Sequence, residues 1–229
     1  MKILCINPNS SREITESIDE VCRKYALKET VVKTVCIPEA PQSIENYEDA
    51  AIATHYLMEK FKTWEEQFDG FIVSCHGDVA VDILREYTEK PVIGIAEASM
   101  IFALMLGHKF SILSLKRKSA TKKEDLVKKY GLENRCASIR ATGLRVIGDH
   151  EEKKKSISRE GRKAVEEDRA EVLVLGCAGM AGLEKELQKE IGVPVLDGVV
   201  CALMLMESLV RYDLKTSKIG KYFKIQKSI

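Results

Sequence analysis

The chain has 229 residues, enough for one α/β domain or two small ones with a buried core. Its 36 Lys and Arg residues against 35 Asp and Glu residues give a net charge of +1. This balance indicates neither a nucleic-acid-binding protein nor one that binds a membrane surface, and it fits a small uncharged or weakly charged ligand.

The apolar runs are too short for an export signal or a membrane span. Asn7 and Pro8 break the N-terminal run too early for a secretory signal. The longest other runs, at residues 101–107 and 199–206, are well short of the ~18–20 residues that cross a bilayer. We therefore expect a soluble, cytoplasmic protein.

The composition also indicates a reducing compartment and a heat-adapted protein. The seven cysteines are odd in number and lack Cys-x-x-Cys spacing, so in the cytosol we expect free thiols. Asn and Gln together number only 8, whereas Lys and Glu are abundant, as in thermophilic proteins. We expect a thermophilic source; a melting midpoint in the mesophilic range would contradict it.

Short strand-type runs alternate with longer amphipathic stretches along the chain. The predicted strands are 2–7, 30–37, 70–75, 91–95, 109–115, 138–144, 171–177 and 194–199. Apolar residues at three-and-four spacing predict helices at 11–27, 47–67 and 155–171. This alternation is typical of βα units and predicts an α/β protein with mainly parallel sheets flanked by helices.

The sequence contains an internal repeat. An apolar strand that ends in a cysteine is followed two positions later by a glycine, and then by a Pro-Val strand and a Met- and Ala-rich helix. The pattern occurs with Cys75 and Pro91 and again with Cys177 and Pro194, at Cys-to-Pro spacings of 16 and 17 residues. It predicts two similar sequence halves, roughly 1–108 and 109–229.

We expect these halves to form two pseudo-symmetric α/β domains. The first would comprise residues 1–97 with about 200–229, and the second residues 98–199. Ligands of open parallel sheets bind beyond the carboxyl ends of the strands. If the domains pack about a pseudo-twofold axis, Cys75 and Cys177 face each other across an active-site cleft.

Cys75 and Cys177 are the candidate reactive residues. Each is followed by a glycine-containing turn, where backbone N–H groups and the start of a helix are expected to lower the thiol pKa from ~8.5. A cysteine in an apolar strand is more often a small buried hydrophobe. We assign that role to the others: Cys5, Cys22, Cys36, Cys136 and Cys201.

Other chemistries find less support in the sequence. A metal site needs three or four ligands. The His and Cys residues are scattered along the chain, except that Cys75 and His76 are adjacent. Adjacent residues at a strand end tend to point apart, so His76 is a weak base for Cys75 in a hydrolase. No phosphate-binding glycine motif follows a strand. We expect no metal and no cofactor.

Two stretches rich in Lys and Arg, 115–124 and 151–163, do not resemble a nucleic-acid platform. They interleave acidic and small residues and contain no aromatic side chain. We expect both to be solvated helix faces or loops.

Seven segments together resemble the Asp/Glu/hydantoin racemase superfamily, and within it the hydantoin/allantoin racemases. They are ILCINPNSS, SIENYEDA, IVSCHGD, PVIGIAEA, VLVLGCAGM, GVPVLDGV and TSKIGKY. The resemblance runs essentially end to end, so it is more specific than any single motif. It implies two pseudo-symmetric α/β domains with one catalytic cysteine from each at a shared cleft, and a homo-oligomer.

The resemblance also implies roles for single residues. The catalytic cysteines fall on Cys75 and Cys177, and the pocket-lining Asn of the INPN motif falls on Asn7. The other expected substrate-binding residues are His76, Gly77, Ser114, Ala178 and Gly179. Local alternatives remain: Asn7 can cap the following helix, Ser114 can bind nearby backbone, and Asp197 can hold its adjacent turn.

Two departures from the family patterns bear on the substrate. Amino-acid racemases resemble CNT and CTE or CTH at the two cysteines, whereas this chain has CHG and CAG, which disfavours free aspartate or glutamate. Hydantoin-branch members commonly show an aromatic residue and then Gly-Asp-Pro-Gly after the first cysteine. Here the run is His-Gly-Asp-Val-Ala, so the pocket wall differs.

The resemblance implies a cofactor-independent racemase of 5-substituted hydantoins. A stereocentre with an acidic hydrogen is inverted when a base removes the proton from one face and an acid returns one to the other. A thiolate and a thiol can do this. The alternatives are an allantoin or amino-acid racemase, a maleate-type isomerase, a decarboxylase, or a ligand-binding protein without catalysis.

Overall fold

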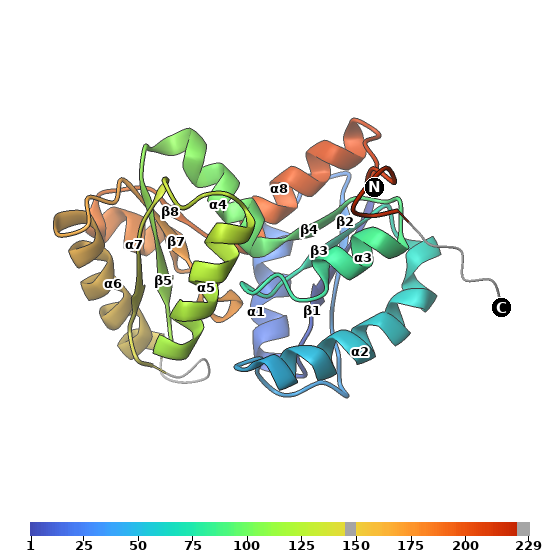
Figure 1. Ribbon diagram of the computed structural model, residues 1–229, viewed down its shortest axis with the longest axis horizontal. Coiled ribbons are helices and arrows are strands. Elements are labelled where there is room, and N and C mark those ends of the chain that lie inside the picture. The colour runs from blue at the N-terminus through green and yellow to red at the C-terminus, as the bar shows by residue number, and fades with distance from the viewer. Residues whose placement is uncertain (145–149, 224–229) are drawn as a thin grey trace. The chain divides into compact units, whose positions relative to one another are not determined.

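The structure is a computed structural model that describes residues 1–144 and 150–223. The chain divides into two compact units (Figure 1). Unit 1 comprises Met1–Ser74, Asp78–Gly94 and the described residues from Ala202 onward, and unit 2 comprises Cys75–Gly77 and the described residues of Ile95–Cys201. The main borders between the units fall after Gly94 and after Cys201. The sequence predicts these borders near residues 97 and 199.

Unit 1 contains a parallel sheet in the order β2-β1-β3-β4. The strands are β1 (Lys2–Asn7), β2 (Val31–Cys36), β3 (Gly70–Val73) and β4 (Val92–Gly94). The helices are α1 (Arg12–Tyr25), α2 (Tyr47–Trp64) with the short 3-10 helix η1 (Glu65–Gln67), α3 (Val81–Tyr87), and α8 (Gly198–Arg211) from Ala202 onward. Every residue of β3 and β4 is buried, as expected of parallel strands covered on both faces.

The two faces of this sheet pack against different helices. Leu4 and Phe71 share an apolar core with Phe61 of α2. Gly70 precedes Phe71 and therefore faces the opposite side. A Cβ on Gly70 would lie 2.3 Å from the sulfur of Met206 in α8. Glycine at this position thus lets α8 lie directly against β3.

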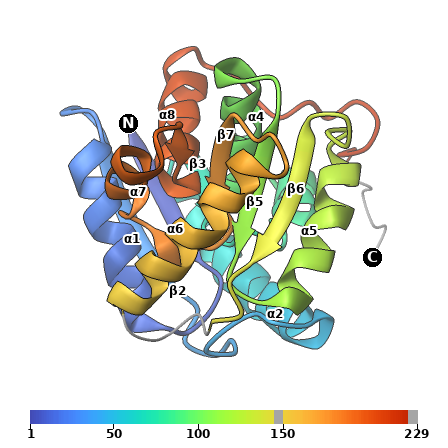
Figure 2. The same ribbon diagram turned by 90° about the vertical axis from the view of Figure 1, so that its left-hand side faces the viewer.

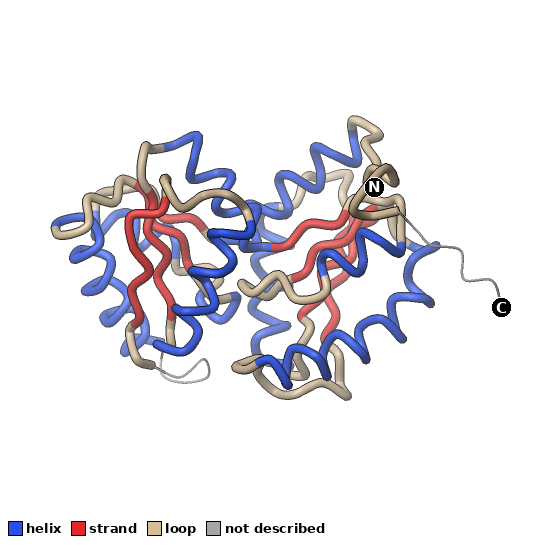
Figure 3. Tube along the Cα trace, in the orientation of Figure 1, coloured by secondary structure: helices blue, strands red, loops and turns tan. Residues whose placement is uncertain are grey.

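Unit 2 repeats this topology with a parallel sheet in the order β6-β5-β7-β8 (Figure 3). The strands are β5 (Phe110–Ser114), β6 (Cys136–Ala141), β7 (Val172–Leu175) and β8 (Val195–Leu196). The helices are α4 (Ile95–Leu106), α5 (Arg117–Lys129), α6 (His150–Glu166) and α7 (Glu184–Ile191), with a 3-10 helix η2 (Ala178–Met180) after β7. The predicted α/β class with parallel sheets flanked by helices is confirmed.

Alternating strand residues give this second sheet two separate cores. Leu113 and Leu173 pack with Ile157 of α6 on one face. Ile112 and Val174 pack with α4 and α5 on the other face. Figure 2 shows α5 and α6 on opposite sides of β5. The side chains of α5 and α6 that face inward therefore approach the sheet from both faces.

The predicted strand 2–7 matches β1, whereas the other predicted strands are too long at their carboxyl ends. β3 ends at Val73 and β7 at Leu175, so Cys75 and Cys177 lie in loops two residues beyond the strands. The reason is that sheet hydrogen bonding stops with Ser74 N–H donating to Ile6 O and Gly176 N–H donating to Leu113 O, at 2.8 and 2.9 Å. Likewise, the predicted strand 194–199 is only two residues long in the structure, because α8 begins at Gly198. The predicted helix 155–171 corresponds to α6, which begins and ends five residues earlier.

The Met- and Ala-rich helices α4 and α8 keep a few apolar side chains at the surface. Ile101, Met105 and Met204 are 45%, 66% and 42% exposed. Within residues 1–144 and 150–223, no helix combines the length and apolarity needed to cross a membrane. Homo-oligomerisation through such side chains stays a prediction.

An ion-pair network at the edge of unit 2 joins β6 to the end of α6. Arg140 donates to both Asp168 carboxylate oxygens, at 2.5 and 2.8 Å, and to Glu167 at 2.6 Å. Ser138 donates to Asp168 as well. The Arg140 guanidinium holds the pKa of the Asp168 carboxyl below its usual value. Networks of this kind are typical of heat-adapted proteins.

Replacement of Arg140 by Met is expected to lower the free energy of unfolding by about 1.5–3 kcal/mol, because the charge-assisted bonds to Asp168 and Glu167 are lost. The folded-state pKa of Asp168 is lowered, so its contribution is present above the unfolded pKa of ~3.9 and disappears as pH falls through the folded value. The difference in Tm between wild type and R140M should therefore shrink from pH 7 to pH 3. Lys62→Met, which breaks the exposed pair with Glu59, is the control and should leave Tm nearly unchanged. A constant Tm difference would contradict this account.

Candidate active site

The two candidate cysteines occupy equivalent loops, each after the third strand of its sheet. Both are half-buried free thiols. Cys75 and Cys177 belong to the same compact unit, because residues Cys75–Gly77 group with unit 2. All predicted site residues except Asn7 therefore lie in unit 2.

The Cys177 thiol caps the short helix η2. Its Sγ accepts the Gly179 N–H at 3.4 Å. Burial raises the pKa of Cys177, and the Gly179 N–H and the charges of Lys123 and Lys153 offset this only in part. The predicted net lowering of the pKa is thus wrong for Cys177. The reason is that η2 has only three residues and offers one N–H, which does not compensate for removal from water.

The loop after β3 holds a neutral histidine beside Cys75. His76 is 3% exposed, and its Nε2 lies 3.4 Å from the Ser99 hydroxyl of α4. Within the described residues, its Nδ1 has no hydrogen-bond partner. Burial, together with the nearby charge of Lys123, lowers the pKa of His76 to about 3. A histidine of that pKa is uncharged at neutral pH and is a poor proton acceptor, which agrees with its weak standing as a base for Cys75.

The next residues of this loop are tightly constrained. Asp78 and Ala80 have φ values of 45° and 64°, in the left-handed region that non-glycine residues rarely adopt. Asp78 is buried and lies against β4, where a Cβ on Gly94 would be 2.1 Å from its Oδ1. Such strain persists only where the surroundings enforce it, and it is common at functional sites. Gly94 therefore leaves the space that the loop after Cys75 requires.

Asn7 and Ser114 make local contacts. The Asn7 side chain is fully buried and its Nδ2 donates to Asn9 and Thr15, both at 2.9 Å. These bonds tie the end of β1 to the start of α1, whose N-cap is Ser11. Ser114, also fully buried, donates to the Lys116 carbonyl at 3.2 Å. Substrate contact by either residue stays a prediction.

Asp197 holds the turn between β8 and α8, which is the local role expected for it. Its carboxylate accepts the Gly182 N–H at 2.9 Å and the Val199 N–H at 2.8 Å. Burial raises its pKa to about 6, although these N–H groups oppose the rise. Because Gly182 lies in the loop that follows Cys177 and η2, Asp197 connects that loop to the start of α8.

Two lysines of unit 2 are buried, and sequence reasoning missed both. Lys123 of α5 and Lys153 of α6 are 6% and 8% exposed. The charge of Lys123 acts on both His76 and Cys177, and that of Lys153 acts on Cys177. The expectation that residues 115–124 and 151–163 are solvated is wrong at these positions. The reason is helical spacing, since Lys123 lies three and four residues before buried Leu126 and Val127.

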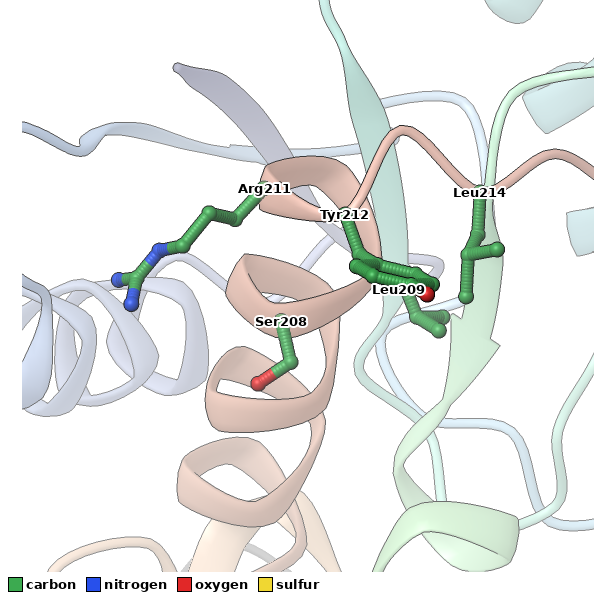
Figure 4. A pocket seen from close by; sticks show the side chains of 5 residues that line it. All are labelled: Ser208, Leu209, Arg211, Tyr212 and Leu214. Carbon is green, nitrogen blue, oxygen red and sulfur yellow. The ribbon is translucent and has the colours of Figure 1, made fainter.

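A separate pocket of about 420 Å³ lies at the other end of α8 (Figure 4). It is lined by Ser208, Leu209, Arg211, Tyr212 and Leu214. Figure 4 shows Arg211 directed away from Tyr212 and Leu214. The pocket contains none of the predicted site residues, and α8 separates it from Gly198 by ~20 Å of helix.

In the described part of the chain, no group of three or more His, Cys, Asp or Glu side chains is arranged to hold a metal ion.

The loops after β3 and β7, together with the repeated fold, define a class of α/β enzyme that carries one free thiol after the third strand of each repeat. The family model described as Asp/Glu/hydantoin racemase matches residues 3–206. The chain therefore belongs to the Asp/Glu/hydantoin racemase family, and it is an isomerase of the racemase type.

Individual relatives match along nearly the whole chain. A hydantoin racemase of Pseudomonas sp. strain NS671 is 40% identical over 226 residues, which cover 97% of this chain and 91% of the relative. A hydantoin racemase of Paenarthrobacter aurescens is 37% identical, with coverage of 98% and 97%. The crystal structure of an allantoin racemase from Pseudomonas fluorescens has a TM-score of 0.96 at 35% identity, and covers 100% of this chain and 99% of that chain.

Proposed function

We propose that this racemase inverts the C5 carbon of 5-substituted hydantoins by proton transfer between Cys75 and Cys177. The observation that carries the proposal is the equivalent placement of two half-buried free thiols in loops of one compact unit. Similarity to hydantoin racemases at 40% and 37% identity supports the substrate class.

The proposed chemistry needs only the two thiols and nearby hydrogen-bond donors. One thiolate removes the C5 proton, and the C–H electron pair moves into the ring to form an enolate at the adjacent carbonyl. The thiol on the opposite face then protonates C5, so the two sulfurs exchange protonation states. Backbone N–H groups of the loops at Gly77 and Gly179 are the proposed donors to the enolate oxygen.

Allantoin is a second candidate substrate. Allantoin is itself a hydantoin, with a ureido group on C5. The structural similarity to an allantoin racemase supports allantoin as a candidate substrate. The same thiol chemistry would serve both substrates. The two substrates differ in the substituent on C5. The run His-Gly-Asp-Val-Ala after Cys75 differs from the common pattern of the hydantoin branch, and we expect it to alter the pocket that receives this substituent.

The experiment follows optical rotation and C5 deuterium uptake in D2O for the wild-type protein. The panel contains enantiopure 5-alkylhydantoins, allantoin, aspartate and glutamate, with deuterium uptake followed at the α-carbon of the amino acids. Maleate is included with proton NMR as the readout, because it and its cis–trans isomer are achiral. Loss of rotation with deuterium uptake for hydantoins is the expected result. Turnover of amino acids or maleate alone would contradict the proposed substrate, and tight hydantoin binding without exchange would indicate a non-catalytic binding protein.

The raised pKa of Cys177 predicts a rate that increases at alkaline pH. A thiol is active as a base only when it is ionised, so proton removal by Cys177 should increase with pH and level off above its pKa. We expect the midpoint above the ordinary thiol value of ~8.5. C5 exchange in the Cys75→Ser variant isolates this step, because Cys177 is then the remaining thiol base. A midpoint at or below 8.5 would contradict the effect of burial.

A further inference from the structure

The segment of residues 216–222, which contains the motif TSKIGKY, is bound to α3 of unit 1. The Lys218 ammonium donates to the carbonyl oxygens of Arg85 and Glu86, at 2.5 and 3.0 Å. Both carbonyls belong to the last turn of α3, where an α-helix leaves its carbonyl groups without partners inside the helix. The helix dipole also favours a cation at this end. Lys218 therefore caps the carboxyl end of α3.

The same segment holds the first turn of α3 and the chain that follows the helix. The Tyr222 hydroxyl donates to Oδ1 of Asp82 at 2.8 Å, and the Lys221 ammonium lies 3.1 Å from Oδ2 of Asp82. The Thr216 N–H donates to the Glu89 carbonyl at 2.7 Å. α3 has only seven residues, fewer than the ~12–15 at which an isolated helix becomes marginally stable in water. Contacts along its whole length thus fix α3 in place.

The equivalent helix of unit 2, α7, is held by α6 instead. Both α3 and α7 follow the loop after a candidate cysteine. Glu186 of α7 pairs with Lys154 of α6, and Glu190 of α7 accepts a hydrogen bond from Ser158 of α6 at 2.5 Å. Each repeat therefore fastens the helix that follows its cysteine loop, and the two repeats use different parts of the chain to do so.

α3 is one of the two anchors of the loop that carries Cys75. The other anchor is the end of β3, where the Ser74 N–H donates to the Ile6 carbonyl at 2.8 Å. Between the anchors, Asp78 and Ala80 have left-handed φ values of 45° and 64°, and Ala80 is the N-cap residue of α3. A backbone conformation of this kind persists only where its surroundings enforce it. Displacement of α3 would therefore change the position of the Cys75 loop.

We propose that Lys218 and Tyr222 are positioning residues for Cys75, which act by holding α3 and, through it, the loop of this thiol. The catalytic consequence rests on the proposed two-thiol racemase function. Proton transfer requires the sulfur close to C5, and a small misplacement of a reacting group lowers the rate strongly. The loop of Cys177 leads to α7, which α6 holds, so the step performed by Cys177 is independent of Lys218 and Tyr222.

The test measures the step of each thiol separately. Lys218→Met and Tyr222→Phe are combined in the Cys177→Ser background, where Cys75 is the remaining thiol base, and in the Cys75→Ser background, where Cys177 remains. We expect C5 deuterium uptake to fall by about tenfold or more in the first background and to stay unchanged in the second. Equal losses in the two backgrounds would indicate a general effect on the fold and would overturn the inference, as would an unchanged rate in the first.

The matched control combines Tyr212→Phe with Lys215→Met. Both residues are exposed and precede the segment 216–222 in the chain. This control should leave the uptake rate of both backgrounds unchanged. The Tm of each variant reports whether it is folded at the assay temperature, and Tyr222→Phe alone, which removes a single hydroxyl, should give the same pattern if the double variant does not fold.

Amide hydrogen exchange tests the inference without turnover. With both cysteines present, Lys218→Met with Tyr222→Phe should increase amide exchange in residues 75–87 by about tenfold and leave residues 177–191 at the wild-type rate. If wild type does not racemise hydantoins, the proposed function is wrong, and this measurement alone decides whether the segment 216–222 holds the Cys75 loop. Unchanged exchange in residues 75–87, or an equal increase in both regions, would overturn the inference.

Discussion

Replacement of Cys75 or Cys177 by serine is expected to reduce racemisation by about 10²–10⁴-fold, the usual contribution of a positioned acid or base. A serine hydroxyl is far less acidic than a thiol, so it supplies neither the thiolate nor an effective proton donor. Each variant keeps one thiol. We therefore expect C5 hydrogen exchange to survive for one enantiomer in Cys75→Ser and for the opposite enantiomer in Cys177→Ser.

The measurement is C5 deuterium uptake in D2O, recorded separately for the two enantiomers, together with optical rotation. Cys36→Ser is the matched control, because Cys36 is also a partly buried free thiol but lies at the end of β2, outside both loops. It should keep wild-type rates. Full racemisation in either Cys75→Ser or Cys177→Ser would exclude the two-thiol mechanism.

Gly94→Ala is expected to destabilise the protein by about 3 kcal/mol, at the upper end of overpacking effects. The new Cβ would lie 2.1 Å from Oδ1 of Asp78, whose buried carboxylate follows the Cys75 loop. For a chain of this size the loss corresponds to a decrease in Tm of about 6–12 °C. Because Asp78 is three residues from Cys75, racemase activity should fall at temperatures where the variant is still folded.

A double substitution tests whether the clash with Asp78 is the cause. If it is, Asp78→Ala in the Gly94→Ala background should restore part of the lost Tm, so that the two effects are not additive. Asp78→Ala alone provides the reference. Additive losses of Tm would show that Gly94→Ala acts through another contact.

The sequence predicted the framework of the site better than its electrostatics. The repeated Cys and Pro-Val pattern identified the equivalent loops of Cys75 and Cys177, because strand, turn and helix signals are local. The ends of β3 and β7 were placed two residues too late, because sheet pairing ends at Ser74 and Gly176, just before each cysteine. Lys123 could have been found from its spacing to Leu126 and Val127, but its charge argued for solvent.

By itself, the sequence determined the α/β class, the internal repeat and the two candidate thiols, because alternating hydrophobicity and turn residues act over short stretches of chain. Only the tertiary structure decided that Lys123 and Lys153 are buried, and that burial raises the pKa of the Cys177 thiol. The physical reason is that desolvation and Coulomb interactions depend on which distant segments surround a group. Lys123 lies on α5, Lys153 on α6 and Cys177 in the loop after β7, and their charges interact only once α5 and α6 pack on the sheet.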